Sequence, residues 1–154
     1  MLWDCVNCEE LIALVVAVVL GGAIGLEREI NGKPAGLRTN ILICIGSAAF
    51  TIMAPYLSSS PEAVTRMVAG VITGVGFLGA GALIQEGKGI HGLTTAASIW
   101  LVTSIGIACG AQLYPLAVTI TILALIVLLG MHPLTRMINK RARKRKKNAA
   151  SEDD

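Results

Sequence analysis

The stretch MVAGVITGVGFLGAGALIQ, Met67 to Gln85, decides how the rest of this chain can fold. Its 19 residues carry no formal charge, and as a helix they are about long enough to cross the ~30 Å hydrocarbon core of a bilayer. Each glycine would cost a soluble helix roughly 1 kcal/mol relative to alanine, whereas in lipid every backbone polar group must be satisfied internally, which imposes the helix. Its five glycines also permit close approach of neighbouring helices: Gly70, Gly74, Gly76, Gly79 and Gly81. We therefore expect a central membrane helix, closely surrounded by others.

The composition of the whole chain agrees with a membrane protein. Of its 154 residues, 54% are hydrophobic and 15% charged, well below the ~25% charged residues of a soluble domain. We expect an external segment over residues 1–10, one transmembrane domain over 11–133 and a basic cytoplasmic tail over 134–154.

Further apolar runs flank the opening stretch and predict an all-α protein with five transmembrane helices. Most approach or exceed the ~18 residues that indicate a span. Ser59, Ser60 and Pro61 read as the start of the third helix, because serine caps and an early proline favour a helix N-terminus. The other expected spans are Leu11–Leu26, Thr39–Leu57, Leu93–Gly110 and Tyr114–Met131.

The positive charges predict the orientation. With five spans, twelve of the 13 Lys and Arg residues fall on one side and only Arg66 on the other. The positive-inside rule then places the N-terminus outside and the C-terminus in the cytoplasm. Three aromatic residues would lie at the outer interface, where such residues are enriched: Trp3, Tyr56 and Tyr114.

Two loops resemble one another. GKPAGLRT begins at Gly32, and GKGIHGLTT begins at Gly87 with one inserted residue. Both loops are expected in the cytoplasm, so the two helical hairpins would form a parallel repeat about an axis along the membrane normal. Chance similarity between short glycine-rich turns is the alternative.

Glu27 and Arg28 are the sharpest chemical feature. The uncharged run before them, Leu11–Leu26, would span only roughly 24 Å of a ~30 Å core. Either the pair lies partly within the membrane, where charges mark a functional-site hypothesis, or it is a solvated cluster at a helix end. Arg38 could pair with Glu27 or Glu29, and Arg28 with Glu86. The candidate cluster at the inner mouth comprises Glu27, Arg28, Glu29, Arg38, Thr39, Thr94 and Thr95.

Other polar residues support no catalytic, metal or cofactor site. Hydroxyl groups in the second and fourth spans, such as Ser47 and Thr103, could line a pocket, but more often they bond back to their own helix. No acidic residue lies in mid-membrane, which weighs against a proton relay or a dehydrated magnesium site. Trp100 is expected to pack in the core. Cys5 and Cys8 form a CxxC that we interpret as inert or oxidised.

The basic tail indicates a membrane-surface partner. Eight of the twelve residues from Arg136 to Lys147 are Lys or Arg, with no aromatics among them. Such a segment is attracted to anionic lipid head groups by ~1 kcal/mol per charge. We expect no nucleic-acid binding.

Four motifs together resemble the MgtC/SapB family of bacterial membrane proteins: GGAIGLERE from Gly21, AGLRT from Ala35, GVGFLGAG from Gly74 and GLTTAASIW from Gly92. The resemblance covers roughly residues 9–131. It implies a plasma-membrane protein of about five spans, tied to growth at low magnesium and to survival under acid or host stress. Some members are similar in acting on the F-type ATP synthase, and many continue into a soluble C-terminal domain, in place of which this chain has its basic tail.

The family's characteristic positions would here include Glu27, Arg28, Gly36, Arg38 and Thr39. We add Gly21, Gly25, Gly36 and Gly92 to the glycines of Met67–Gln85 as candidate helix-packing positions. Helices this rich in glycine would leave grooves through which copies of the chain could associate, as a homo-oligomer.

Two functions follow as expectations. The first is a non-enzymatic regulator that packs against another membrane complex through glycine-rich faces. The second is a magnesium or other cation transporter or channel subunit that uses the inner-mouth cluster. The packing interpretation also predicts that Gly74→Leu disrupts folding or assembly.

Overall fold

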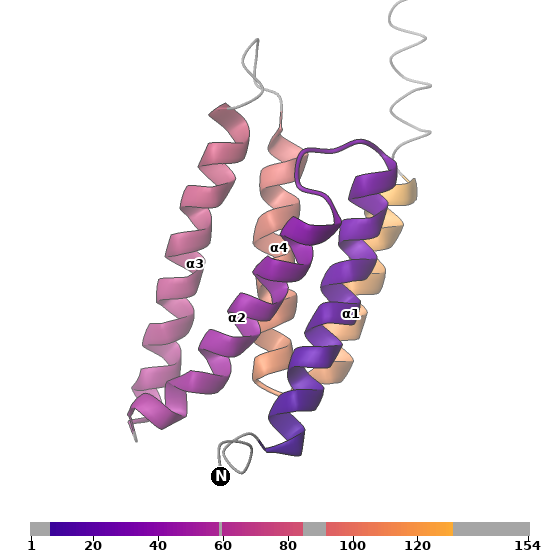
Figure 1. The fold of residues 1–154 in the computed structure, drawn as a ribbon. Coiled ribbons are helices and arrows are strands. Elements are labelled where there is room, and N and C mark those ends of the chain that lie inside the picture. Colours follow the sequence, from indigo (N-terminus) through magenta and orange to yellow (C-terminus); the bar gives the residue numbers. More distant parts are fainter. Residues whose placement is uncertain (1–6, 59, 85–91, 131–154) are drawn as a thin grey trace, which may run out of the picture.

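The computed structural model describes residues 7–58, 60–84 and 92–130, and this part of the chain forms five helices (Figure 1). Four of them are long and apolar enough to cross a membrane, and a shorter apolar helix follows. The predicted all-α architecture is confirmed. The second hairpin's loop, Trp3, Cys5 and the basic tail lie outside the described residues. The helices are α1 (Cys8–Ile30), α2 (Leu37–Leu57), α3 (Pro61–Ile84), α4 (Leu93–Gly110) and the last helix, Tyr114–Gly130.

The helix ends agree well with the sequence except at α1. The fourth span begins and ends where it was predicted, and α3 begins at the predicted Pro61. By contrast, α1 begins at Cys8, inside the expected external segment, and continues past Leu26 to Ile30. Glu27 and Arg28 are therefore part of the helix and not of a loop.

Aromatic and acidic side chains tie three helix ends together. The Tyr56 hydroxyl at the end of α2 donates to the Glu10 carboxylate in the first turn of α1. Gln112 donates to the Glu9 carboxylate at 3.1 Å, and the Tyr114 hydroxyl to the Glu9 carbonyl at 3.4 Å. Tyr56 and Tyr114 thus lie at the same end of the bundle, the end at which α1 begins.

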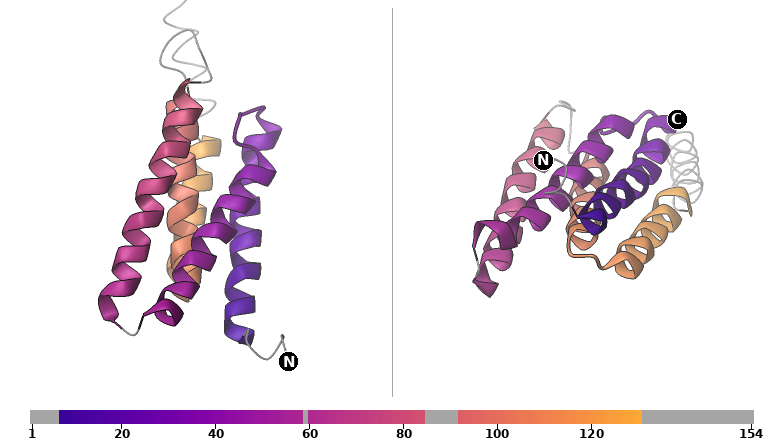
Figure 2. Two further views of the ribbon diagram at one scale, coloured as in Figure 1. Left: turned by 60° about the vertical axis from the view of Figure 1, so that its left-hand side comes forward. Right: turned by 60° about the horizontal axis from the view of Figure 1, so that its bottom comes forward.

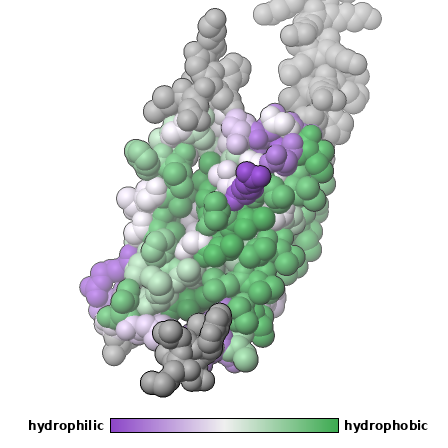
Figure 3. Space-filling model, viewed as in Figure 1, coloured by the Kyte–Doolittle hydropathy of each residue, from purple (hydrophilic) through white to green (hydrophobic). Residues whose placement is uncertain are grey.

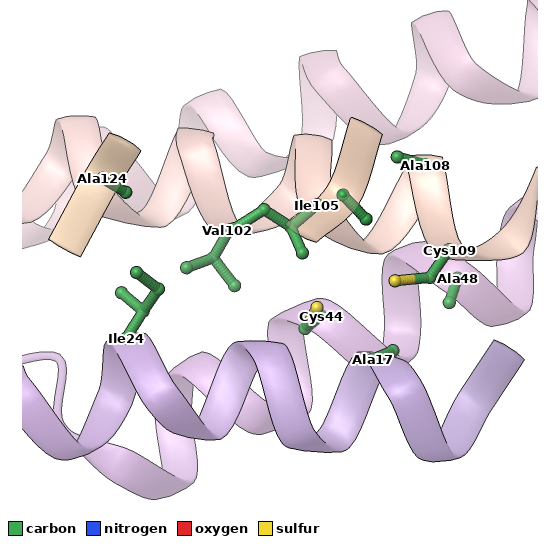
Figure 4. Close-up of a cluster of buried hydrophobic side chains, with 10 residues drawn as sticks. Ala17, Ile24, Cys44, Ala48, Val102, Ile105, Ala108, Cys109 and Ala124 are labelled. Carbon is green, nitrogen blue, oxygen red and sulfur yellow. The ribbon is translucent and has the colours of Figure 1, made fainter. Parts of the chain in front are cut away.

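The centre of the bundle is α4, and the expected central position of α3 is wrong. Half of the apolar span of α4 is buried (50%), against 11% of that of α3. α3 lies at one edge, where it contacts α2 and α4 but not α1 (Figures 1 and 2). On the other side, Ile24 of α1, Val102 of α4 and Ala124 of the last helix converge in one apolar core (Figure 4).

Two GxxxG pairs bring neighbouring helices against α2. A Cβ atom at Gly21 of α1 would lie 2.6 Å from the Cys44 Cβ, and one at Gly25 would lie 2.8 Å from the Leu37 Cα. On α4, a Cβ at Gly106 would overlap the Cys44 carbonyl oxygen, and one at Gly110 would lie 2.7 Å from the Thr51 Cβ. Only glycine permits such short helix separations.

The glycines of α3 are placed differently. Among the described residues, a Cβ at Gly70, Gly74, Gly76 or Gly81 would meet nothing within 4 Å, and one at Gly79 would make an ordinary 3.7 Å contact with Ala96. The close packing expected around this helix is therefore not made within the described part of one chain. The expectation that Gly74→Leu disrupts folding loses its structural reason.

Five hydroxyls of the second and fourth spans bond to their own helices. Ser47 donates to the Ile43 carbonyl at 2.7 Å, and Thr103 donates to the Ile99 carbonyl at 2.9 Å. Thr51, Ser98 and Ser104 do the same. Trp100 is 56% exposed, so its expected place in the core is wrong. Apolar side chains cover the middle of the face seen in Figure 3, and hydrophilic ones gather toward its ends.

Candidate functional site

Arg28 connects the end of α1 to the beginning of α4. Its side chain is only 2% exposed, and its Nη2 atom donates a 2.9 Å hydrogen bond to the Thr95 Oγ1. Thr95 is 3% exposed, and its carbonyl accepts the Ser98 hydroxyl at 2.8 Å. A buried guanidinium is costly unless its surroundings compensate for the lost water, so this contact marks a specified position and not a solvated helix end.

Glu27, next to Arg28, is also buried, at 8% exposure. Its Oε1 atom accepts the Asn31 side-chain amide at 2.8 Å, and the same amide donates to the Glu27 carbonyl at 2.9 Å. The buried Oε2 atom has no hydrogen-bond partner in the described part of the chain. The side chains of Glu27 and Arg28 are thus both buried within the bundle.

Asn40 holds the loop between α1 and α2. It is fully buried, and its side-chain amide donates to the carbonyls of Ala35 and Gly36 at 2.8 and 2.7 Å. Ala35 in turn is buried against Val75 of α3 and Ile99 of α4, and the loop can be followed as it reaches toward α4 in Figure 1. The Asn40 Oδ1 atom, like the Glu27 Oε2, has no hydrogen-bond partner among the residues described.

Glu29 caps the second helix. Its Oε2 atom accepts the Leu37 backbone N–H at 2.9 Å, which places a carboxylate at the positive N-terminal end of α2. A Cβ atom at Gly36 would overlap this oxygen, so glycine leaves room for the cap. Gly92 precedes α4 with φ of +89°, a conformation that favours glycine.

The predicted cluster is therefore only partly brought together. Arg28 and Thr95 are in contact, whereas Arg38, Thr39 and Thr94 are exposed. Neither Glu27 nor Glu29 bonds to Arg38 in the described chain, and the suggested partner Glu86 lies outside the described residues. Thr94 borders a groove of about 330 Å³ between α4 and the last helix.

Sequence reasoning missed the structural role of Asn40 and Ala35. The available signal was an amide side chain four residues after Gly36, in the first turn of α2, where it can reach back to a carbonyl before the helix. The site can donate hydrogen bonds through Arg28 and accept them at two buried oxygens. Within the described ranges, no group of three His, Cys, Asp or Glu residues could hold a metal ion.

We predict that Glu29→Ala lowers the free energy of unfolding by about 1 kcal/mol, because the first turn of α2 loses its cap. Thermal unfolding of the purified protein in detergent measures the change. Lys33→Ala, which removes an exposed charge from the loop directly after α1, is the matched control and should leave the midpoint unchanged. Equal midpoints for Glu29→Ala and Lys33→Ala would contradict the cap.

Comparison with known proteins gives the family. Residues 14–137 match the sequence model of the MgtC family. The chain belongs to the MgtC family. It is 43% identical over 142 residues to the putative magnesium transporter YhiD of Escherichia coli, covering 87% of this chain and 66% of that protein.

Two proteins named MgtC are also similar. The protein of Brucella abortus is 40% identical, over 86% of this chain and 55% of its own length. That of Salmonella typhimurium is 36% identical, over 84% and 55%. The chain thus spans between 55% and 66% of the length of these relatives. No solved structure matches. Family membership and the apolar helices make it a multi-pass bacterial inner-membrane protein.

Proposed function

We propose that this MgtC-family chain is a non-enzymatic regulator that binds another membrane complex. The observation that carries the proposal is the closed interior of the bundle. Gly106 and Gly110 bring α4 into backbone contact with α2. The buried hydroxyls along this contact bond to their own helices. An ion path needs polar groups that replace water, and the hydroxyls of the α2–α4 contact instead donate to carbonyls of their own helices.

The outer edge of α3 is the surface that we propose for the partner. Four exposed small residues share one face of the helix at spacings of four, three and four residues: Ala69, Thr73, Gly76 and Ala80. The Thr73 hydroxyl donates to the Ala69 carbonyl at 2.8 Å, so this donor needs no acceptor from a partner helix. Faces of this kind let a second membrane helix approach closely.

The family resemblance supplies a candidate partner, the F-type ATP synthase, and a physiological setting of low magnesium and acid stress. By restraining proton-driven ATP turnover, such a regulator would act without transporting an ion itself. The small edge of α3 fits this role because it presents a helix face and no catalytic group.

Transport of magnesium or another cation is the second candidate. The E. coli relative is named a putative magnesium transporter. The two buried oxygens without hydrogen-bond partners among the described residues, Glu27 Oε2 and Asn40 Oδ1, favour this alternative because cations bind to such oxygens. The neighbouring guanidinium of Arg28 opposes it, since a like charge repels a cation.

Two measurements test the two functions. The purified chain, reconstituted in liposomes, should give no magnesium flux above that of empty liposomes. ATP synthase subunits should co-purify with the chain from membranes. Gly76→Leu should lose most of this co-purification while the protein still folds, because a larger side chain blocks the edge of α3. Gly130→Leu, which likewise adds a leucine in open space, is the control and should retain it.

Two results would contradict the regulator. Magnesium flux that Glu27→Gln abolishes would favour the transporter. Co-purification that survives Gly76→Leu would show that the outer edge of α3 is not the binding surface.

A further inference from the structure

A groove of about 610 Å³ lies between α2 and α3, on a different face of α3 from the small outer edge. Its walls are apolar and include Ile43 and Phe50 of α2 and Leu78 of α3. Three glycines keep it open: a Cβ atom at Gly46, Gly70 or Gly74 would meet no described atom within 4 Å. The hydroxyl of the lining residue Ser47 donates to the Ile43 carbonyl, so it needs no acceptor from a bound molecule.

Arg66 borders this groove near the beginning of α3 and is exposed. It makes no hydrogen bond or ion pair within the described part of the chain. The acidic residue one turn before it, Glu62, accepts a hydrogen bond from the Ser60 hydroxyl at 2.8 Å. The groove therefore combines a long apolar channel with one cation at the end where α3 begins.

The dimensions of the groove indicate the kind of occupant. From Arg66 to Leu78 it follows α3 for roughly 18 Å at ~1.5 Å per residue, close to one leaflet, or half of a ~30 Å hydrocarbon core. An acyl chain, whose methylene groups pack at the ~4 Å of a carbon–carbon contact, matches this length and the apolar walls of the groove.

We propose that the groove between α2 and α3 binds an anionic phospholipid. One acyl chain would lie along Gly46, Gly70 and Gly74, and the phosphate would accept hydrogen bonds from the Arg66 guanidinium. The Arg66 guanidinium at one end of an otherwise mainly apolar groove favours a ligand that has one anionic group and a long apolar chain. The site does not depend on the proposed regulatory function, because it uses a different face of α3.

Photo-crosslinking tests this site in the full chain. The protein is reconstituted with phosphatidylglycerol that carries a photoreactive group in its acyl chain, and the crosslinked peptides are mapped. We expect crosslinks concentrated on the α2 and α3 residues of the groove. Excess unlabelled phosphatidylglycerol should displace the probe better than phosphatidylcholine does. The same choice of lipids separates an anionic site from a general affinity for acyl chains.

Two variants test separately what the Arg66 cation and the apolar groove contribute to lipid binding. Arg66→Gln should weaken phosphatidylglycerol binding about fivefold and remove the preference over phosphatidylcholine. Gly74→Leu should fill the channel and abolish crosslinking in the groove, with unchanged helix content and elution volume. Lys33→Gln, an exposed cation that does not border the groove, should change neither.

Crosslinks spread evenly over all lipid-facing helices would overturn the proposal. So would crosslinking in the groove that is unaffected by both Arg66→Gln and Gly74→Leu. Protein–protein crosslinks through Gly46 and Gly70 would replace the lipid with a second copy of the chain.

Discussion

Gly106→Leu is expected to prevent the chain from folding into a stable bundle. The added side chain would overlap the Cys44 carbonyl oxygen and lie 2.8 Å from the Ser47 Cβ. These neighbours are backbone and a buried side chain of the adjacent helix, so they cannot move aside without separating α2 from α4. Overpacking costs about 1–3 kcal/mol where neighbours can relax, and here the whole central contact would be displaced. The measurement is the yield of monodisperse protein after detergent extraction.

Gly76→Leu is the matched control for this prediction. The change in chemistry is identical, but a Cβ at Gly76 would meet nothing within 4 Å among the described residues. The variant should extract and elute like the original protein. Gly106→Ala should fall between the two, with about 1–3 kcal/mol of destabilisation. If Gly106→Leu elutes like Gly76→Leu, the close crossing of α2 and α4 is not required for folding.

The contrast between these two glycines explains where sequence reasoning on the fold stopped. Hydropathy located the spans well, because the cost of exposing backbone and polar groups in lipid depends on local composition. Hydropathy did not show which helix lies at the centre of the bundle. Glycines were most numerous in α3, but the close contacts are made by GxxxG pairs in α1 and α4, and the Gly106–Gly110 pair was not singled out. A count of glycines does not say which face of a helix meets a neighbour.

The candidate site shows the same limit. The short uncharged run before Glu27 and Arg28 left burial and a solvated helix end as alternatives, and it could not show that α1 already begins at Cys8. The hydrogen-bond partners of Glu27 and Arg28 could not be derived from the sequence. Thr94 and Thr95 are adjacent in sequence and ~100° apart around a helix, so only Thr95 faces Arg28 while Thr94 is exposed. The order of the chain gave no means of fixing this rotation.

Arg28 and Thr95 lead to the second large effect. A buried hydrogen bond to a charged group contributes about 1.5–3 kcal/mol, and Arg28→Met removes this bond between α1 and α4. We expect Arg28→Met to lower the free energy of unfolding by about this amount. Thr95→Val keeps the shape of the side chain but removes the acceptor of the 2.9 Å bond. It should cost about 1–3 kcal/mol, the price of leaving a buried donor unsatisfied.

A double-mutant cycle isolates the contact from the other consequences of losing a charge. In the Arg28→Met background, Thr95→Val should cost almost nothing, because no guanidinium remains to be satisfied. Thr95→Ser retains the hydroxyl and should behave like the original protein, which separates the hydrogen bond from packing of the methyl group. Denaturant or thermal unfolding of the four proteins in the same detergent gives the coupling energy. If the Thr95→Val cost is the same in both backgrounds, the bond between α1 and α4 does not stabilise this end of the bundle.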